Sequence, residues 1–308
     1  MYQQPFRTEE LQAELERTLG FKLAPLVRIG GGGAINFKAE RVSDGLKFVV
    51  KCFPPDRRES GERLLETLKT MEGVKTPVRL FAEALPAVLL DHLVFCLSWQ
   101  EGEVIAPDRL TDEQWDAFLD DYQRLSERMQ LSVPADPIRP LLKWWQDLRG
   151  ACRGLTGRIF GPVLDDMHEE DLVFHPDLTR TIHGDLHPGN VLFEGGGVKC
   201  FMDLESFRPG YPPEDIACYC IAAVKRFGRT EGRQDRILAM FGHAARRLPY
   251  SPHEWRTAVN ALCLMGMRKR VCGGKRIGLI SACELTVRGK LFALFRRQID
   301  VAERAGVA

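Results

Sequence analysis

The chain has 308 residues, of which 44% are hydrophobic and 28% charged, and its formal net charge is +1. The length suggests one large domain or two lobes, and the composition is typical of a globular protein. The near-neutral charge gives no support for binding to nucleic acid or to a membrane surface. The nine cysteines are odd in number and show no CxxC spacing, so they indicate reduced thiols in a cytoplasmic protein. The N-terminus shows no signal-peptide pattern, and no apolar run is long enough to span a membrane.

The first hundred residues predict a small sheet that carries one main helix. Leucines recur at one-turn spacing between residues 8 and 19, which predicts a helix ended by Gly20. A second helical pattern covers 62–71, with its apolar residues on one face. Short runs rich in β-branched and aromatic residues predict strands, and these cover 26–29, 36–40, 47–53, 78–81 and 87–99.

The pattern becomes helical from about Gly102 onward. Thr111 and Gln114 form a capping-box pair that predicts the start of a helix with an apolar stripe ending at Met129. A further helix is predicted over 141–152, and a hairpin over 191–202 that turns at glycines 195–197. The fold class is therefore α+β, with a small antiparallel-sheet lobe first and a larger, mostly helical lobe second.

Four consecutive glycines, Gly30, Gly31, Gly32 and Gly33, lie between the first two predicted strands. Glycine lets backbone amides approach a polyphosphate closely. A flexible turn between strands is the alternative interpretation. The run therefore indicates a phosphate site only in combination with other residues.

Lys51 lies near the end of the strand predicted over 47–53. It is the first residue that could form a phosphate site together with the glycine run. A lysine that points under the glycine run neutralises phosphate oxygens, whereas most lysines at strand ends are solvated. We expect Glu62, on the helix predicted at 62–71, to hold the Lys51 ammonium group. Glu59 and Glu66 are competing candidates, since Glu66 lies one turn from Glu62 on the same face.

The segment 183–190 has the pattern H-x-D-L-x-x-x-N. Its Asp185 and Asn190 lie five positions apart in a tight loop, so the carboxylate can meet a substrate hydroxyl and the amide oxygen a metal ion. Asp203 follows the predicted hairpin and is a candidate second metal ligand; Mg²⁺ prefers such oxygen ligands. His183 is expected to support the loop as a packed residue.

In these residues the chain resembles the kinase-like phosphotransferases of the aminoglycoside phosphotransferase and choline kinase group. IHGDLHPGNVLF and CFMDLESFRPGYPPEDIACY are similar to the family's catalytic loop and metal-binding segment, so the strong similarity covers 181–221. A weaker similarity in order and spacing covers 29–99. The resemblance implies a bilobal protein-kinase-like fold, with a nucleotide-binding lobe over 1–98 and a catalytic and acceptor-binding lobe over 99–308.

The resemblance also implies roles for individual residues. Asp185 is the expected catalytic aspartate, Asn190 and Asp203 are the expected magnesium ligands, and Lys51 is the expected phosphate-contacting lysine. Asp215 matches a family position that braces the catalytic loop. The hinge between the lobes is expected at 98–102, which includes Trp99, where backbone groups meet the nucleotide base.

We therefore expect Mg²⁺-dependent transfer of the γ-phosphoryl group of ATP or GTP to a hydroxyl of a small molecule such as an aminoglycoside, a sugar or an amino alcohol. The alternatives are a catalytically silent kinase-fold module that binds nucleotide, and a protein kinase. Twelve positions separate Asp203 from Asp215, and this segment is too short for the activation segment of a regulated protein kinase. The Ala-Pro-Glu motif that ends such a segment does not follow either. No nucleic-acid partner is expected, and the basic residues between Arg268 and Arg297 are interpreted as a solvated helical surface. The alternatives for this region are recognition of the acceptor, or binding of nucleic acid or anionic lipid.

Overall fold

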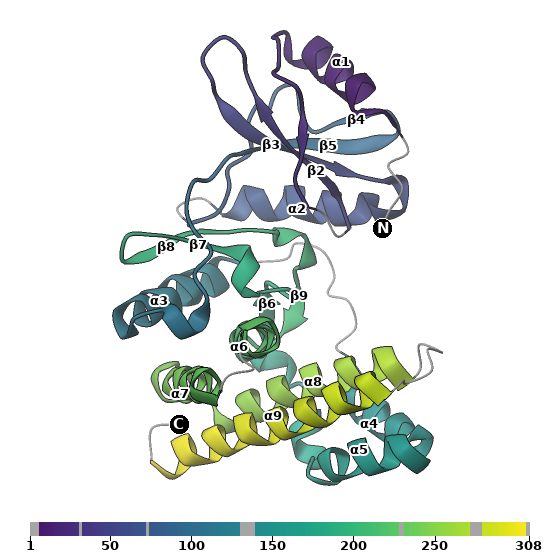
Figure 1. Ribbon diagram of the computed structural model, residues 1–308, viewed down its shortest axis with the longest axis vertical. Coiled ribbons are helices and arrows are strands. Elements are labelled where there is room, and N and C mark those ends of the chain that lie inside the picture. The colour runs from purple at the N-terminus through teal and green to yellow at the C-terminus, as the bar shows by residue number, and fades with distance from the viewer. Residues whose placement is uncertain are drawn as a thin grey trace. The chain divides into compact units, whose positions relative to one another are not determined.

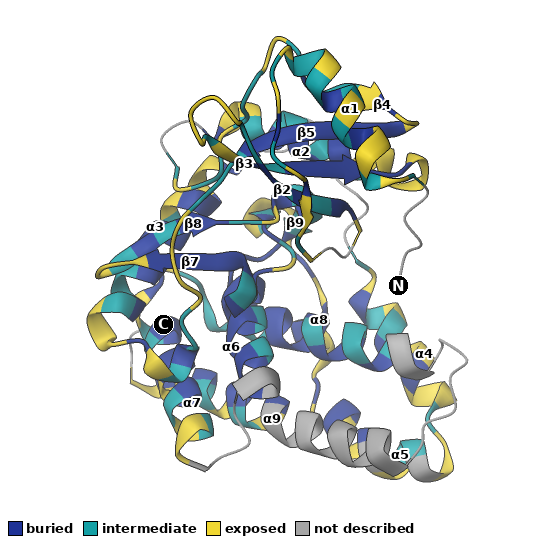
Figure 2. Ribbon diagram, turned by 45° about the horizontal axis from the view of Figure 1, so that its top comes forward, coloured by how far each residue is buried: buried dark blue, intermediate teal, exposed yellow. Residues whose placement is uncertain are grey.

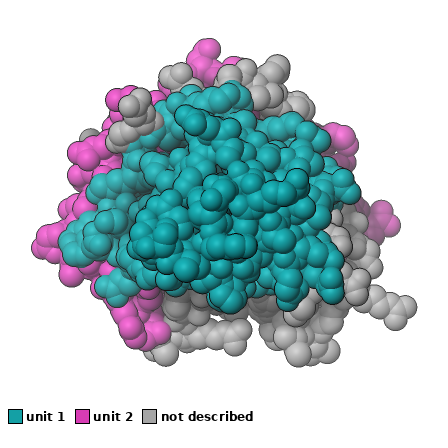
Figure 3. Space-filling view, turned by 90° about the horizontal axis from the view of Figure 1, so that it is seen from above, with its two compact units in different colours: residues 1–103, 192–206 teal, residues 104–191, 207–308 magenta. Residues whose placement is uncertain are grey.

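The computed structural model describes residues 6–30, 33–71, 74–129, 139–227, 231–271 and 279–305. The chain divides into two compact units (Figure 3). The first unit consists of Met1–Glu103 and Leu192–Ser206, and the second of Val104–Val191 and Phe207–Ala308. This division differs from the predicted one at residue 98, because the segment Leu192–Ser206 belongs to the first unit.

The first unit contains a five-stranded antiparallel sheet with the strand order β1-β2-β3-β5-β4 (Figure 1). Side chains alternate between the two faces of a strand, so paired residues on neighbouring strands share a face. Phe37 lies opposite Val50, and Val50 lies opposite Cys96, which places all three on one face. The strands are β1 (Val27–Arg28), β2 (Ile35–Glu40), β3 (Lys47–Phe53), β4 (Ala87–Leu89) and β5 (His92–Ser98).

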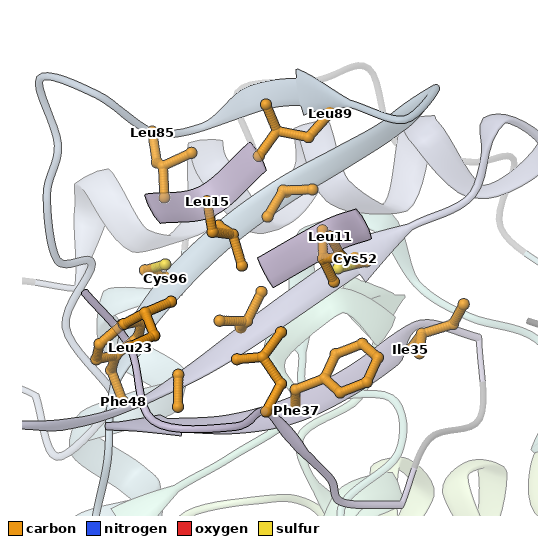
Figure 4. Close-up of a cluster of buried hydrophobic side chains, with 14 residues drawn as sticks. Leu11, Leu15, Leu23, Ile35, Phe37, Phe48, Cys52, Leu85, Leu89 and Cys96 are labelled. Carbon is orange, nitrogen blue, oxygen red and sulfur yellow. The ribbon is translucent and has the colours of Figure 1, made fainter. Parts of the chain in front are cut away.

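That face of the sheet packs against helix α1 (Thr8–Leu19). Leu11 and Leu15 of α1 are fully buried in a cluster with Phe37, Phe48 and other side chains of the sheet (Figure 4). The helix ends at Gly20, whose φ of 75° is the left-handed conformation that favours glycine. The predicted bounds of this helix are confirmed.

The other face of the sheet packs against helix α2 (Arg58–Thr70), and Figure 1 shows the two helices on opposite sides of the strands. Gly61 allows the close approach, because a Cβ atom built on it comes within 2.8 Å of Leu93 and 3.0 Å of Phe53. Strand β5 has the α1 layer on one face and α2 on the other, and it is buried over His92–Leu97 (Figure 2). The buried, apolar character of β5 follows from having a layer on each face.

Two predicted strands differ from the structure. The segment 78–81 forms only a single bridge, between Arg79 and Leu97, and is not a strand. The run predicted over 87–99 is divided into β4 and β5 by a turn at Leu90 and Asp91, whose φ angles are 48° and 63°. An aspartate tolerates this left-handed conformation better than a β-branched residue.

A hairpin returns the chain to the first unit. It consists of β7 (Val191–Glu194) and β8 (Gly197–Phe201), and it turns at Gly195 as predicted. Glu103 and Phe193 form an antiparallel bridge, and the Phe201 amide donates a hydrogen bond to the Lys75 carbonyl. These backbone bonds explain why the hairpin clusters with the first unit although it follows residue 99 in the sequence.

The second unit is mainly helical. Thr111 caps helix α3 through a bond from the Gln114 amide, which confirms the predicted capping box. A short antiparallel pair, β6 (Arg180–Ile182) and β9 (Arg208–Gly210), lies beside these helices. The helices are α3 (Asp112–Arg128), α4 (Leu141–Ala151), α5 (Gly154–Asp165), α6 (Pro213–Phe227), α7 (Glu231–Arg247), α8 (Pro252–Val271) and α9 (Leu279–Arg304).

Stacked aromatic rings join α3 to α6 in the core of the second unit. Trp115 stacks on Phe118, and both rings contact Tyr219 of α6. All three side chains are almost completely buried. Together with the antiparallel sheet of the first unit, this helical core confirms the predicted α+β class.

The basic C-terminal segment is described only in part. The Arg268 guanidinium lies 4.4 Å from the centre of the Trp144 ring, and Arg296 is buried and donates to the Asp166 carbonyl. Both side chains therefore make contacts within the protein. None of the helices in the described ranges is long and apolar enough to cross a membrane.

Candidate active site

A cavity of about 310 Å³ opens in the first unit, on the side of the sheet that faces α2. Apolar side chains such as Val49, Leu64 and Leu97 form much of its wall. Polar groups come from Lys51 of β3 and from Asp203, which follows β8. A pocket with apolar walls and a few convergent polar groups is typical of a small-molecule site.

Lys51 is buried in this wall, with a side chain that is only 4% exposed. Its ammonium nitrogen lies 2.9 Å from Oδ1 of Asp203 and 2.6 Å from Oε2 of Glu205. Burial acts to lower the pKa of the ammonium group, but the charges of Glu205 and Asp203 outweigh it, so the pKa is raised above the ordinary value. Lys51 therefore stays a cation inside the cavity.

The predicted pairing of Lys51 with Glu62 is wrong. The Glu62 side chain is 59% exposed and bonds to Arg58, while Glu66 bonds to Lys69. The reason lies in the phase of α2, because its buried face carries Gly61 and Leu64, and the carboxylates lie outside it.

Glu205 takes the place of the helix carboxylate, although no sequence motif identified it as a partner of Lys51. It lies two residues after Asp203 in a 3₁₀ turn, Leu204–Ser206, and this turn contacts α2. The sequence Asp-Leu-Glu contains the only available signal, which is a second carboxylate next to the one already assigned. Its reach to Lys51 depends on the 3₁₀ turn, for which the sequence shows no specific pattern.

Asp203 has a backbone conformation that is unusual for a residue with a side chain. Its φ of 56° lies in the left-handed region, and its side chain is 48% exposed. Such conformations occur preferentially at functional sites, where surrounding contacts maintain them. Here the conformation accompanies a carboxylate that lines the cavity and also bonds to Lys51.

The predicted nucleotide-binding segments belong to the first unit. Gly30, the first glycine of the run, has a φ of 40°, and Gly33 is its last, while Gly31 and Gly32 lie outside the described residues. Trp99 lines the cavity, and the Lys38 ammonium lies 4.9 Å from the centre of its ring. The segment 98–102 contributes five consecutive residues to the cavity wall.

The predicted catalytic loop lies in the second unit, directly after β6. Asp185 is exposed, whereas Asn190 is buried at the end of a short 3₁₀ helix, Pro188–Asn190. The Asn190 amide nitrogen donates to the Asp185 carbonyl at 2.9 Å. Because this bond uses the nitrogen, the amide oxygen is the group of Asn190 that remains to accept a ligand.

Asp215 holds this loop from α6. Its carboxylate accepts bonds from the amides of His183 (2.6 Å) and Gly184 (2.9 Å), and from the Tyr122 hydroxyl (2.9 Å). Gly184 has a φ of 79°, a conformation that favours glycine. Burial raises the pKa of Asp215, although the charges of His183 and Arg208 act in the opposite direction. Asp215 thus fixes the backbone on the N-terminal side of Asp185.

His183 is fully buried, and its ring packs edge-on against Phe207 at 5.8 Å between centroids. The structure therefore agrees with its interpretation as a packed support for the loop. At the other end of the loop, Nδ1 of His187 accepts a bond from the Gly189 amide. These local contacts hold the segment between Asp185 and Asn190 in a defined turn.

A buried ion-pair network lies next to Asp215. Glu214 is completely buried and bonds to both Arg139 and Arg208. Burial acts to raise the pKa of Glu214, but the charges of Arg208 and Arg139 outweigh it and lower the pKa. The network anchors the start of α6, which carries Asp215.

The two predicted metal ligands, one in each unit, carry oxygen donors of the kind that Mg²⁺ binds. Asp203 presents a half-exposed carboxylate and Asn190 an amide oxygen, and Mg²⁺ binds few protein oxygens and retains several waters. In the ranges that the structure describes, no group of three or more histidine, cysteine, aspartate or glutamate side chains forms a metal-binding cluster. Carboxylate and amide oxygens suit Mg²⁺ better than zinc or another thiolate-binding metal.

Three solved structures show the same fold. A spectinomycin phosphotransferase, APH(9)-Ia, in complex with ADP and spectinomycin has a TM-score of 0.61 and 14% identity, over 99% of this chain and 100% of that one. An aminoglycoside phosphotransferase from Alicyclobacillus acidocaldarius has a TM-score of 0.59 and 17% identity, over 97% and 98%. The enzyme APH(3'')-Id from Streptomyces rimosus has a TM-score of 0.51 and 18% identity, over 84% and 98%.

The sequence comparisons give the family. A search of curated proteins finds no match. The model of the phosphotransferase enzyme family, by contrast, matches residues 27–256, which include the cavity, the predicted catalytic loop and Asp215. The chain belongs to the phosphotransferase enzyme family.

Proposed function

We propose that this protein transfers the γ-phosphoryl group of ATP or GTP to a hydroxyl group of a small molecule. The observation that carries the proposal is the buried Lys51 cation in the wall of the cavity, bonded to Asp203 and Glu205. A buried cation beside carboxylates, in a pocket with apolar walls, suits a ligand with an aromatic base and a polyphosphate. Membership of a phosphotransferase family gives independent support.

The first unit binds the nucleotide in this proposal. The base lies against the segment 98–102, near Trp99, between apolar side chains such as Val49 and Leu97. Lys51 contacts phosphate oxygens, and the backbone amides of Gly30 and Gly33 lie over the phosphates. Solved relatives of the same fold are complexes with ADP, which is consistent with this assignment.

Asn190 and Asp203 would hold Mg²⁺, whose charge, when it is bound, neutralises phosphate oxygens and favours departure of the nucleoside diphosphate. The chain passes from the second unit to the first between Val191 and Leu192, directly after Asn190 and Val191. Its amide oxygen is oriented by the bond from its nitrogen to the Asp185 carbonyl. Asp203 would leave its bond with Lys51 for the metal, so that Lys51 turns to the phosphates.

Asp185 orients the acceptor hydroxyl and accepts its proton as the oxygen attacks the γ-phosphorus. The exposed carboxylate stands on a loop whose backbone is held on one side by Asp215 and on the other by Asn190. Phosphoryl transfer depends mainly on such positioning and on charge stabilisation. The rigid loop is therefore as important to the proposal as the carboxylate itself.

The acceptor is a small molecule such as an aminoglycoside, a sugar or an amino alcohol. Solved proteins of the same fold are complexes with spectinomycin or hygromycin B. The short segment between Asp203 and Asp215 argues against a protein acceptor. A catalytically silent nucleotide-binding module is the second candidate, and the cytoplasm is the predicted location.

Calorimetric titration tests the nucleotide assignment. ADP with Mg²⁺ is titrated into the wild-type protein and into Lys51→Ala, with adenosine as the ligand that lacks phosphates. We expect Lys51→Ala to weaken ADP binding at least about 10-fold, since a charged hydrogen bond contributes roughly 1.5–3 kcal/mol. The affinity for adenosine should stay almost unchanged. Absence of ADP binding by the wild-type protein would refute the proposal.

A further inference from the structure

Asn36 is a polar residue in the wall of the cavity, directly opposite Lys51 on the neighbouring strand. It belongs to β2, and its Cα partner on β3 is Lys51. Cross-strand partners share a face of the sheet, so both side chains lie on the face that α2 covers, and both line the cavity. No sequence motif described above includes Asn36.

The Asn36 side chain lacks a hydrogen bond that it needs. Its Oδ1 atom is buried and has no partner in the part of the chain that the structure describes. Lys51, the nearest cation by register, uses its ammonium group for Asp203 and Glu205 instead. Buried side-chain amides in native proteins almost always have partners, and an exception at a cavity points to a ligand.

The register of the sheet shows which part of a ligand Asn36 meets. Lys51 is three residues along β3 from Phe48, which corresponds to roughly 10 Å, and Phe48 lies opposite Ser98 at the start of the predicted hinge. Asn36 is therefore at the Lys51 end of the cavity and distant from the segment 98–102. It is also the third residue after Gly33, and its carbonyl accepts a bond from the Ile29 amide. That bond fixes Asn36 relative to the strand that leads into the glycine run.

We propose that Asn36 is a nucleotide-positioning residue whose side-chain amide hydrogen-bonds the phosphate chain beside Lys51. The ligand class is a nucleoside polyphosphate, so the inference rests on the proposed function. A rotation of the terminal group exchanges the amide nitrogen and oxygen, and the nitrogen then donates to a phosphate oxygen. Because the amide is neutral, it orients the phosphates without adding negative charge next to them.

The test compares ADP with adenosine, because only ADP carries phosphates. Asn36→Leu keeps the approximate size of the side chain and removes its polar atoms. We expect this variant to bind ADP about 10-fold more weakly, the effect of one hydrogen bond to a charged group, and to bind adenosine within about 2-fold of wild type. Its thermal midpoint is expected to be unchanged or higher, since leucine buries no unpaired acceptor.

Two results would overturn the inference. One is an Asn36→Leu variant that binds ADP as tightly as the wild type, and the other is an equal loss of ADP and adenosine affinity. The second result would show that Asn36 contacts the nucleoside or only maintains the sheet. Glu40→Gln, on the same face of β2 but outside the cavity wall, is the matched control and is expected to change neither affinity.

A second variant keeps the test decisive if Asn36→Leu does not fold. Asn36→Asp has the same shape but places a negative charge beside the phosphates. We expect it to weaken ADP binding by more than about 10-fold and adenosine binding much less. Equal losses would again contradict the inference. Failure of the proposed function has a different signature, because the wild-type protein would then bind neither ADP nor adenosine.

Discussion

The ammonium group of Lys51 and the carboxylate of Glu205 lie 2.6 Å apart although 154 positions separate them in the sequence. The pair joins the centre of the sheet to the turn that follows the β7–β8 hairpin. The Lys51 side chain is 4% exposed and that of Glu205 is 18% exposed. The turn after the hairpin therefore supplies the carboxylate that pairs with Lys51, in place of a carboxylate from α2.

Replacement of Glu205 by glutamine should destabilise the protein. Glutamine leaves the buried Lys51 cation with one anionic partner instead of two, and the loss of a hydrogen bond to a buried charge costs about 1–3 kcal/mol. Urea unfolding measures this change. Glu62→Gln is the matched control, because that exposed carboxylate should contribute less than about 0.5 kcal/mol. Equal effects of the two substitutions would contradict the observed pairing.

Asp215→Asn should loosen the catalytic loop. The asparagine retains one acceptor oxygen, but its amide group faces a backbone N–H of His183 or Gly184 that needs an acceptor. We expect a loss of about 1–3 kcal/mol in the free energy of unfolding, together with faster hydrogen exchange of the Gly184 amide. Asp177→Asn, at an exposed position in the same unit, serves as the control. Unchanged exchange at Gly184 would show that Asp215 does not hold the loop.

The ion pairs of Glu214 make stability depend on pH in the acid range. Its pKa is lowered in the folded protein from the ordinary value of 4.5, so its contribution is complete above 4.5 and is lost as the pH falls through the lowered value. Urea unfolding at neutral pH and at several values below 4.5 should show this loss. The opposite trend would contradict the assigned direction.

Glu214→Gln isolates the same group at neutral pH. The substitution leaves the largely buried guanidinium groups of Arg139 and Arg208, 15% and 20% exposed, without their shared buried anion, which should cost about 3–5 kcal/mol. The variant should also lose less additional stability on acidification than the wild type. A variant as stable as the wild type at neutral pH would show that the network contributes nothing to folding.

The elements that local patterns define were predictable from the sequence. Leucine spacing and Gly20 fixed α1, the pair Thr111 and Gln114 fixed the start of α3, and a glycine run fixed the turn of the β7–β8 hairpin. The order of motifs from the glycine run to Asp203 indicated the family that the family model confirms.

Features that depend on tertiary contacts were not predictable in this way. The partner of Lys51 depends on the phase of α2 and on the 3₁₀ turn that carries Glu205, and neither leaves a clear periodic signal. The break between β4 and β5 depends on a turn at Leu90 and Asp91 that lacks glycine and proline, the residues that usually mark one. The unpaired amide oxygen of Asn36 follows from burial and strand register, which the alternation of residues alone does not show.

The most direct test of the central claim is acceptor-dependent phosphoryl transfer by the wild-type protein and by Asp185→Asn. The wild type, with ATP and Mg²⁺, is screened against aminoglycosides, sugars and amino alcohols, and the phosphorylated product is identified by mass spectrometry. We expect an acceptor that yields product and ADP with the wild type, and at least about a 100-fold lower turnover with Asp185→Asn, while ADP affinity stays within about 3-fold. Equal turnover by the two proteins on that acceptor, or tight ATP binding without transfer to any acceptor, would contradict the account.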